Sequence, residues 1–280
     1  MTLINNVLCP VDFFPGSRTA LKYAASVSRK YGALLHILHV VPIPVSTTYA
    51  ASLEAPSHEA REVAAVREMA KLEKETTSTG VRVETSLRAG EIEREINSAV
   101  ASVGADLVVM GTHGRRGFER WFLGSVTERM LRRSSVPILT TSDVGDGSRP
   151  LEHVRNVLVT TDFSGGTEVP ISYARSMSEG SSATVTLLHV TSHSQEVDRE
   201  AIMVQLNGLV PPDASNLACR VEKGDPYRKI LDVIDAESVD LVVMNIHGKG
   251  MLERALVGAT AERVIRAATC PVLGIPSLAL

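Results

Sequence analysis

The segment NVLCPVDFFPGSRTALKYAASVSRKYGALLHILHVV, at residues 6–41, is matched without a gap by NVLVTTDFSGGTEVPISYARSMSEGSSATVTLLHVT, at residues 156–191. A second block, DLVVMGTHGRRGFERWFLGSVTERMLRRSSVPIL at 106–139, aligns with DLVVMNIHGKGMLERALVGATAERVIRAATCPVL at 240–273. The offset falls from 150 residues to 134, so the first copy carries 16 additional residues. We expect them at 42–57, a stretch rich in turn-forming and small residues. The chain is therefore a tandem repeat.

Each copy alternates short apolar runs with amphipathic segments. In the first copy this pattern predicts strands near 6–11, 33–40, 81–87, 106–111 and 136–140, with helices near 18–31, 57–79, 91–103 and 125–134. In the second copy it predicts strands near 156–160, 184–190, 217–221, 240–245 and 271–275, with helices between them. Such alternation is typical of a parallel α/β sheet with helices on both faces. We expect one domain at 1–143 and another at 153–280, joined by a polar linker.

The composition is that of an ordinary soluble globular protein, with 44% hydrophobic and 22% charged residues. It excludes a disordered chain, a collagen-like fibre and a small disulfide scaffold. A net charge of −3 gives no reason to expect nucleic-acid binding. No apolar run approaches the roughly 18 residues that span a membrane. The N-terminus lacks the features of a signal peptide. Cys9, Cys219 and Cys270 show no metal-ligand spacing, which predicts buried thiols in the reducing cytoplasm.

A glycine cluster follows the fourth predicted strand: Met110-Gly111-Thr112-His113-Gly114-Arg115-Arg116-Gly117, and then Gly124-Ser125 where a helix begins. Glycine lets backbone N–H groups approach a phosphate closely. The start of a helix adds free N–H donors and a positive dipole end. Arginines supply positive charge for the outer phosphates. A strand before the cluster and a helix after it make an anion site a fair hypothesis, although glycines also serve turns.

The pattern G-x2-G-x9-G-[ST], together with VDFF early in the chain and LHV at the second strand, resembles the universal stress protein family. The resemblance covers nearly the whole chain as two consecutive family domains. It implies Rossmann-like domains, each with a five-stranded parallel sheet. It also implies ATP binding, as in many members of the family, and pairing of the domains through their last strands.

The resemblance also implies roles for residues of the first copy. Asp12 would accept hydrogen bonds from adenosine, beside Pro10 and Val11, and Val40 would contact adenine. Ribose and phosphates would be surrounded by Met110, Gly111, Gly114, Arg115 and Gly117, with Gly124, Ser125 and Val126 holding the phosphates at the helix start. A Mg²⁺ ion could accompany the ATP, although no protein ligand for it is evident, and no metal ligand or catalytic residue is assigned.

The second copy departs from this motif. Asn245 replaces Gly111, Met251 replaces Gly117, Lys249 replaces Arg115 and Ala259 replaces Ser125, while Gly248 and Gly258 remain. An Asn side chain occupies space where close approach is needed, and Ala removes a hydroxyl. We expect an intact nucleotide motif in the first domain and a degenerate one in the second.

Simpler interpretations remain open for several residues. Asp12 could merely start a turn before the first helix. His39 and His189 lie in apolar strands, where a histidine satisfied by the backbone is more common than a metal ligand. His113 and His247 could touch phosphate or only order the loop. The apolar segments VPIL (136–139) and CPVLGI (270–275) are candidate edge strands, which favours association between domains or subunits.

These observations predict a regulatory stress-response protein that binds an adenine nucleotide in its first domain. The alternative is a slow ATPase or another nucleotide-using enzyme, although the sequence shows no strong catalytic constellation. A third possibility is a scaffold without a ligand. The expected assembly is a pseudo-dimer of the two domains within one chain, with a homodimer of whole chains left open.

Overall fold

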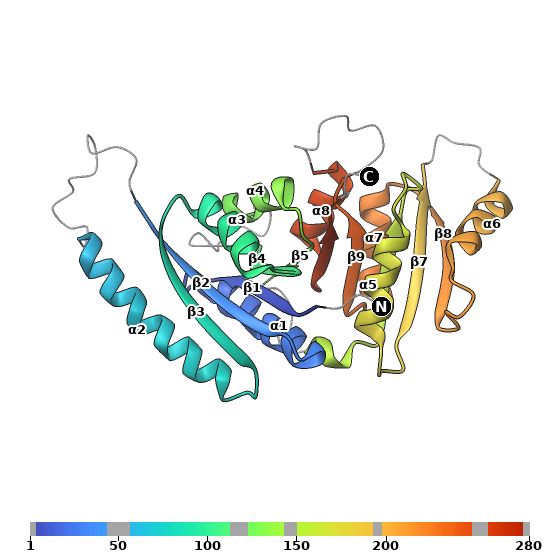
Figure 1. Cartoon of the computed structure of the whole chain (residues 1–280). Coiled ribbons are helices and arrows are strands. Elements are labelled where there is room, and N and C mark those ends of the chain that lie inside the picture. The colour runs from blue at the N-terminus through green and yellow to red at the C-terminus, as the bar shows by residue number, and fades with distance from the viewer. Residues whose placement is uncertain are drawn as a thin grey trace.

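Strands and helices alternate through both copies of the repeat (Figure 1). The computed structural model describes residues 4–43, 57–112, 123–142, 150–192, 198–247 and 257–276. The first copy contains β1 (Asn6–Pro10), α1 (Pro15–Tyr31), β2 (Leu34–Pro42), α2 (His58–Thr77), β3 (Arg82–Gly90), α3 (Ile92–Val103), β4 (Leu107–Gly111), α4 (Ser125–Arg133) and β5 (Ile138–Thr141). After the short 3-10 helix η1 (Leu151–His153), the second copy contains β6 (Asn156–Thr161), α5 (Glu168–Ser178), β7 (Thr184–Thr191), α6 (Arg199–Leu209), β8 (Leu217–Lys223), α7 (Pro226–Ala236), β9 (Leu241–Asn245), α8 (Ala259–Ala267) and β10 (Val272–Ile275).

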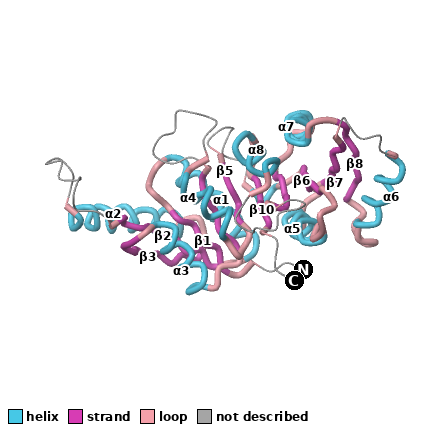
Figure 2. The backbone as a smooth tube through the Cα atoms, turned by 90° about the horizontal axis from the view of Figure 1, so that it is seen from above, coloured by secondary structure: helices cyan, strands magenta, loops and turns pink. Residues whose placement is uncertain are grey.

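The described strands form one ten-stranded sheet in the order β3-β2-β1-β4-β5-β10-β9-β6-β7-β8. All pairings within each copy are parallel, as expected, and β5 pairs with β10 in the antiparallel sense. Figure 2 shows β5 and β10 side by side in the middle of the molecule. The predicted fold class, two tandem Rossmann-like α/β domains, is confirmed.

The pairing of β5 with β10 places equivalent residues of the two copies opposite each other. Leu139 faces Leu273, which is its counterpart in the repeat, and both are fully buried. The hydroxyl of Thr140 donates across this seam to the carbonyl of Val272, at 3.1 Å. Such a register is what a local two-fold axis through the leucine pair would produce.

Two layers of apolar side chains cover the two faces of the sheet. One layer joins the strands to α1, α2, α5 and α6, and the other joins them to α3, α4, α7 and α8. Adjacent strand residues alternate between the layers, with Val7 and Cys9 in the first and Leu8 in the second. Each layer contains residues of both copies, so the two cores are continuous across the seam.

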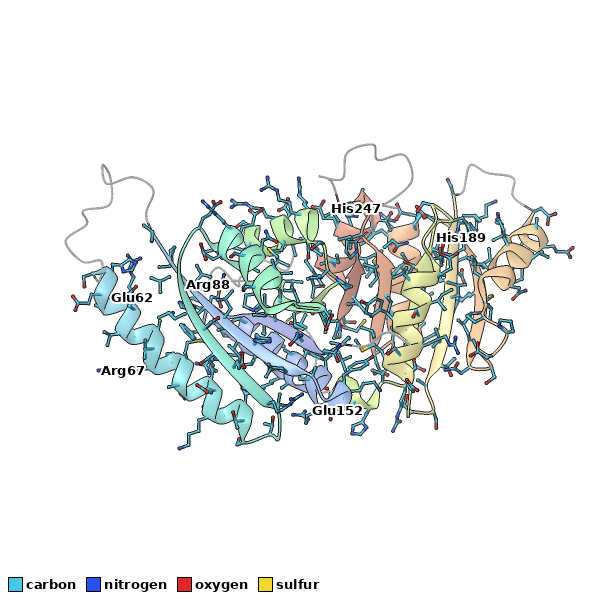
Figure 3. The ribbon with its side chains drawn as sticks, in the orientation of Figure 1. Glu62, Arg67, Arg88, Glu152, His189 and His247 are labelled. Atoms are coloured by element: carbon cyan, nitrogen blue, oxygen red, sulfur yellow. The ribbon has the colours of Figure 1, made fainter. Side chains whose placement is uncertain are left out.

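Polar contacts between α1 and the second copy flank the seam on one face. The Tyr31 hydroxyl lies 2.9 Å from that of Ser176, and Lys30 donates to the Glu179 carbonyl at 2.7 Å. Arg29 pairs with Glu152 of η1 at 2.5 Å (Figure 3). Burial raises the pKa of the Tyr31 hydroxyl, which keeps it protonated as a hydrogen-bonding group.

The additional length of the first copy is divided differently from our expectation. Helix α2 has 20 residues and its counterpart α6 has 11, so part of the extra chain lies in the helix rather than in 42–57. Its sequence is rich in Ala, Glu and Lys, which favour helix. Helix α2 lies along β3 and β2 at one end of the sheet, with Arg67 on its outer side (Figure 3). Residues 44–56 fall outside the described residues.

Several element boundaries also differ from the expected ones. Helix α1 begins at Pro15 instead of near 18, because proline is well suited to the first turn of a helix. Strands β2 and β3 extend to Pro42 and Gly90, pairing along their full length. Cys9 and Cys270 are buried free thiols, whereas Cys219 is only partly buried, contrary to our expectation of three buried thiols. No helix in the described ranges is long and apolar enough to cross a membrane.

Replacing Gly274 by Ala should destabilise the fold. A Cβ there would lie 2.5 Å from Cγ2 of Ile246, a stiff and fully buried side chain, and β10 is held by neighbours on both edges. We expect a loss of about 1–3 kcal/mol in the free energy of unfolding, the usual effect of overpacking, measured by urea denaturation.

Gly208→Ala is the matched control. Gly208 lies inside α6 with nothing within 4 Å of its added Cβ, so alanine should stabilise the chain by about 0.5–1 kcal/mol. Equal effects of the two alanines would contradict the packing described at the seam.

Candidate functional site

A cavity of about 340 Å³ opens at the carboxyl ends of β1, β2 and β4. Strand β1 lies between β2 and β4, so the direction of the crossovers reverses at this point. Ligands of open α/β sheets bind at such switch points. The lining consists of Pro10, Val11, Asp12, Ser17, Leu38, His39, Val40, Pro42, Ile92, Ile96, Met110, Gly111, Gly124, Ser125, Val126 and Thr127.

Most of the residues selected from the sequence line this one cavity. They are Pro10, Val11, Asp12, Val40, Met110, Gly111, Gly124, Ser125 and Val126. Gly114, Arg115 and Gly117 lie outside the described residues, as does His113. The structure thus brings together side chains from segments more than 100 residues apart in the chain.

The sequence reasoning missed several lining residues. Ile92 and Ile96 stand four apart on α3, and this spacing alone could have placed both on one face directed at the sheet. Thr127 and Ser17 lie on the first turns of α4 and α1, where no motif singled them out. His39 was assigned to the core, yet it also lines the cavity.

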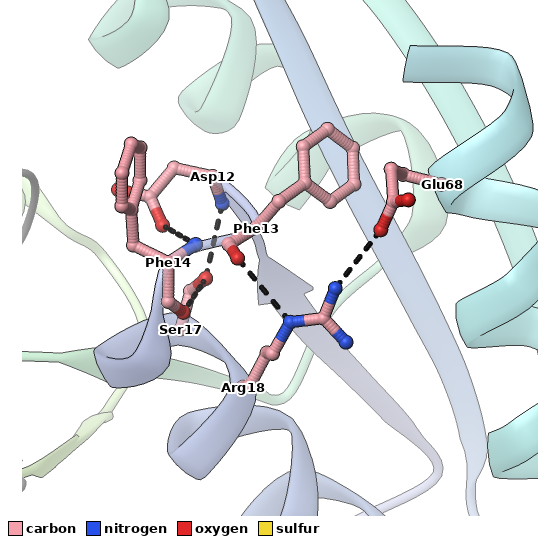
Figure 4. A network of polar contacts seen from close by, with 6 residues as sticks. All are labelled: Asp12, Phe13, Phe14, Ser17, Arg18 and Glu68. Carbon is pink, nitrogen blue, oxygen red and sulfur yellow. Dashed lines mark hydrogen bonds and ion pairs between the residues drawn. The ribbon is translucent and has the colours of Figure 1, made fainter. Parts of the chain in front are cut away.

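Asp12 starts a tight turn between β1 and α1 (Figure 4). Its Oδ1 accepts from the amide of Phe14 at 3.1 Å, and its own amide donates to Oγ of Ser17 at 3.2 Å. The Ser17 hydroxyl in turn donates to the Phe14 carbonyl at 3.0 Å. The simpler interpretation of Asp12 as a turn residue therefore describes its contacts correctly. The same residue lines the cavity, so both roles are compatible.

Phe13, the next residue in the turn, has the unusual backbone angle φ 68° for a residue other than glycine. Its ring stacks on His39 with centroids 4.2 Å apart. His39 Nδ1 lies 2.7 Å from the carbonyl of Val11, and since a carbonyl only accepts, Nδ1 is the donor. The expectation of a histidine satisfied by the backbone is thus met, and the imidazole braces the wall of the cavity.

One end of the cavity is formed by the end of β4 and the start of α4. The amide of Gly124 donates to the carbonyl of Thr112 at 2.7 Å, which joins the end of β4 to the start of α4. Thr127 donates its hydroxyl to the carbonyl of Gly111 at 2.8 Å, tying the first turn of α4 to β4. A Cβ on Gly111 would lie 2.8 Å from the carbonyl oxygen of Gly16, so glycine is required by packing as well.

Helix α4 presents its N-terminus to this end of the cavity. Its N-cap is Gly124, which has no side chain to cap the helix. Ser125 and Val126 follow in the first turn. The first N–H groups of a helix lack intrahelical partners and carry partial positive charge. The geometry is therefore suited to an anion.

The titratable side chains among the described lining residues are Asp12 and His39. Both are engaged with the backbone of the cavity wall. Cys9 lies just before Pro10 in β1, but burial raises the pKa of its thiol far above the usual range, so it stays protonated. Within the described ranges, no group of three or more His, Cys, Asp or Glu side chains could hold a metal ion.

The corresponding place in the second copy keeps the same turn. Phe163 has φ 58°, its ring lies 4.5 Å from that of His189, and His189 Nδ1 lies 2.8 Å from the carbonyl of Thr161. The end of β9 differs from that of β4, because Asn245 donates its side-chain amide to the Gly165 carbonyl at 3.3 Å.

Three hydroxyl-bearing positions of the first copy are apolar in the second. Ile246, Ala259 and Ala261 stand at the positions of Thr112, Ser125 and Thr127. His247 lies just beyond β9 and is half-buried (Figure 3).

Comparison with known proteins relates the chain to one family. The model of the universal stress protein family matches residues 4–142 and again 153–276. A universal stress protein of Mycolicibacterium smegmatis is 26% identical over 287 residues, covering 95% of each chain. Universal stress protein MJ0531 of Methanocaldococcus jannaschii is 29% identical over 143 residues, covering 49% of this chain and 81% of its own length.

Among solved structures, a universal stress protein from Archaeoglobus fulgidus superposes with a TM-score of 0.75 at 22% identity, covering 98% of this chain and 97% of its own. That likeness concerns the fold. Since the family model matches both copies of the repeat, the chain belongs to the universal stress protein family, as a tandem member with two family domains.

Proposed function

We propose that the N-terminal domain binds ATP in the cavity between β1, β2 and β4, and that the protein acts as a regulatory stress-response protein. The observation that carries the proposal is the convergence of the predicted motif residues on one cavity with an apolar end and a helix N-terminus. Its volume of about 340 Å³ falls in the range of small-molecule sites. Membership of the universal stress protein family agrees with this proposal.

The apolar end of the cavity suits a purine ring. Val40, Ile92 and Ile96 supply aliphatic walls. The carbonyl of Leu38 accepts from the amide of Val11, and peptide groups two residues apart on a strand face the same side. Val40 therefore directs its N–H and carbonyl beyond the end of β1, into the cavity. These groups complement the N1 acceptor and N6 donor of adenine, whereas guanine presents the reverse order.

The opposite end suits the phosphates. The N-terminus of α4 offers the amides of Ser125 and Val126 and the Ser125 hydroxyl, with Gly124 allowing close approach. By the family motif, Gly114, Arg115 and Gly117 would complete the phosphate site, with Arg115 adding positive charge. Asp12 would accept hydrogen bonds from the nucleoside between these two ends of the cavity. A Mg²⁺ ion, where present, would bind through the phosphates.

A regulatory role is proposed in preference to fast catalysis. Asp12 and His39, the titratable side chains of the described lining, are both bonded to backbone groups. Slow hydrolysis of ATP remains the alternative, because positioning and electrostatics contribute most of phosphoryl-transfer catalysis. A ligand-free scaffold is the second alternative.

The proposed assembly has a pseudo-dimer within each chain, for which the register of Leu139 against Leu273 is the supporting observation. A homodimer of whole chains is a separate proposal, tested by sedimentation of the intact protein. The cytoplasm is the proposed location, supported by the free thiols of Cys9, Cys219 and Cys270.

ATP should copurify with the protein or bind it after removal of endogenous nucleotide. We expect chromatography of the denatured protein to release adenine nucleotide, and ATP at 100 times its Kd to add about 2.7 kcal/mol to the stability of the folded state. GTP should give a clearly smaller thermal shift, because of the groups that Val40 presents. Absence of both released nucleotide and a shift with ATP would leave only the scaffold.

Replacing Gly124 by Val should abolish ATP binding while the fold is retained. Gly124 has φ −57° and ψ 135°, angles that valine adopts readily, so the effect should come from the side chain in the phosphate site. We expect at least a 100-fold increase in the Kd for ATP, measured by isothermal titration calorimetry.

The chain supplies a matched control in Gly258, the N-cap of α8, with φ −60° and ψ 137°. Gly258→Val should leave the Kd of the high-affinity site unchanged, because the second domain carries the degenerate motif. Equal losses from the two variants would show that the asymmetry between the domains is wrong.

A further inference from the structure

Arg18, on the first turn of α1, connects the Asp12–Phe13 turn to helix α2 (Figure 4). Its Nε donates to the carbonyl of Phe13 at 3.2 Å. Its Nη2 donates to Oε2 of Glu68, on α2, at 2.9 Å. One guanidinium thus holds a backbone group behind the cavity and a carboxylate of the neighbouring helix at the same time.

The turn needs such support because Phe13 lies in the left-handed region, with φ 68°. A residue other than glycine is strained there and keeps the conformation only when its surroundings impose it. The ring of Phe13 is fixed by the stack on His39. The carbonyl of the same residue is fixed by Arg18.

The second copy holds the same turn by other means. There the hydroxyl of Thr161 accepts from the amide of Phe163 at 3.1 Å and lies 2.7 Å from the hydroxyl of Thr167. The position of Arg18 is occupied by Glu168. The second copy therefore anchors its turn from the side that corresponds to the cavity.

The first copy lacks that hydroxyl, because Val11 stands at the position of Thr161. Val11 is buried at 5% exposure and lines the cavity, where an apolar surface suits a purine or sugar. On the cavity side of this turn the Ser17 hydroxyl accepts from the Asp12 amide and donates to the Phe14 carbonyl, which leaves the Phe13 carbonyl to another donor. Arg18 provides that donor from the α2 side, and α2 is the helix that is longer in the first copy.

We propose that Arg18 is a positioning residue of the nucleotide site, holding the Asp12–Phe13 turn through the Phe13 carbonyl and fixing it against α2 through Glu68. This role rests on the proposed function. The Arg18–Glu68 ion pair is partly exposed, with side-chain exposures of 35% and 43%, so by itself it contributes little to stability. Its importance lies in the geometry that it gives to the turn.

The test compares the Kd values of ATP and adenosine for the intact chain and for Arg18→Met, which keeps an apolar stem of similar length. We expect both Kd values to rise about fivefold, the effect of one lost charge-assisted hydrogen bond, and their ratio to stay constant. Ser125→Ala should instead weaken ATP and leave adenosine unchanged, because Ser125 lies at the phosphate end.

The double variant Arg18→Glu/Glu68→Arg separates positioning from the ion pair. It can restore a pair of opposite charges between α1 and α2, but a carboxylate at 18 cannot donate to the Phe13 carbonyl. We therefore expect its affinity for adenosine to stay as low as that of Arg18→Met. Recovery of the original affinity would assign the effect to the ion pair and overturn the proposal.

Arg175→Met is the matched control. Arg175 pairs with Asp213 at 2.6 Å, its side chain is 34% exposed, and it lies on α5, away from the lining of the cavity. It should leave both Kd values unchanged.

Equal affinities of the intact chain and Arg18→Met would overturn the role of Arg18 alone. If the intact chain bound neither ATP nor adenosine, the proposed function would fail, and the role of Arg18 with it.

Discussion

The antiparallel pairing of β5 with β10 is the contact on which the rest of the molecule depends. It merges two five-stranded parallel sheets into one and buries Leu139 against Leu273 without any exposed strand edge in the middle. Both core layers run through it, so the apolar cores of the two copies are continuous. The carbonyl of Thr141, at the end of β5, accepts from the amide of Thr112, which directly follows β4. The seam and the cavity therefore share one strand.

Much of the fold could be predicted from the internal repeat, because each copy is an independent reading of the same pattern. Strand and helix order and the parallel sense follow from alternating apolar runs and amphipathic segments. The cavity could be anticipated as well, since parallel strands end at one edge and the glycine cluster follows one of them. Pro10, Val40 and Gly124 are far apart in sequence but lie at that shared edge.

The remaining features depend on contacts that no local pattern encodes. Helix α2 lies close to the helix predicted near 57–79, but part of the additional length of the first copy lies in this helix and not only at 42–57, where we expected it. His39 has the sequence context of a core histidine. It lies beside the cavity because β1 ends at Pro10, before the end of the neighbouring strand β2. The link from Arg18 to Glu68 joins residues 50 positions apart on two helices whose relative placement is tertiary. Contacts of this kind can be identified only when the positions of the two helices relative to each other are known.

The two copies show which parts of this fold resist change and which are free to change. Asp106 accepts from the amides of Asn5 and Asn6, and Asp240 accepts from the equivalent amides in the second copy. Buried or partly buried backbone donors need partners in any sequence, so this bond is kept.

The contacts between the third and fourth helices of each copy illustrate the opposite case. In the first copy Glu93 pairs with Arg129 and Arg133, whereas in the second Tyr227 takes the place of Glu93 and its ring lies 3.9 Å from the guanidinium of Arg263. An ion pair in one copy and a cation–π contact in the other join the same two helices, because packing requires attraction but not one particular chemistry. The end of the cavity at β4 and α4 is different, since the anion proposed to bind there would need donors and open space. In the second copy the Asn245 amide is bonded to the Gly165 carbonyl and Ala259 carries no hydroxyl, yet the same fold is kept.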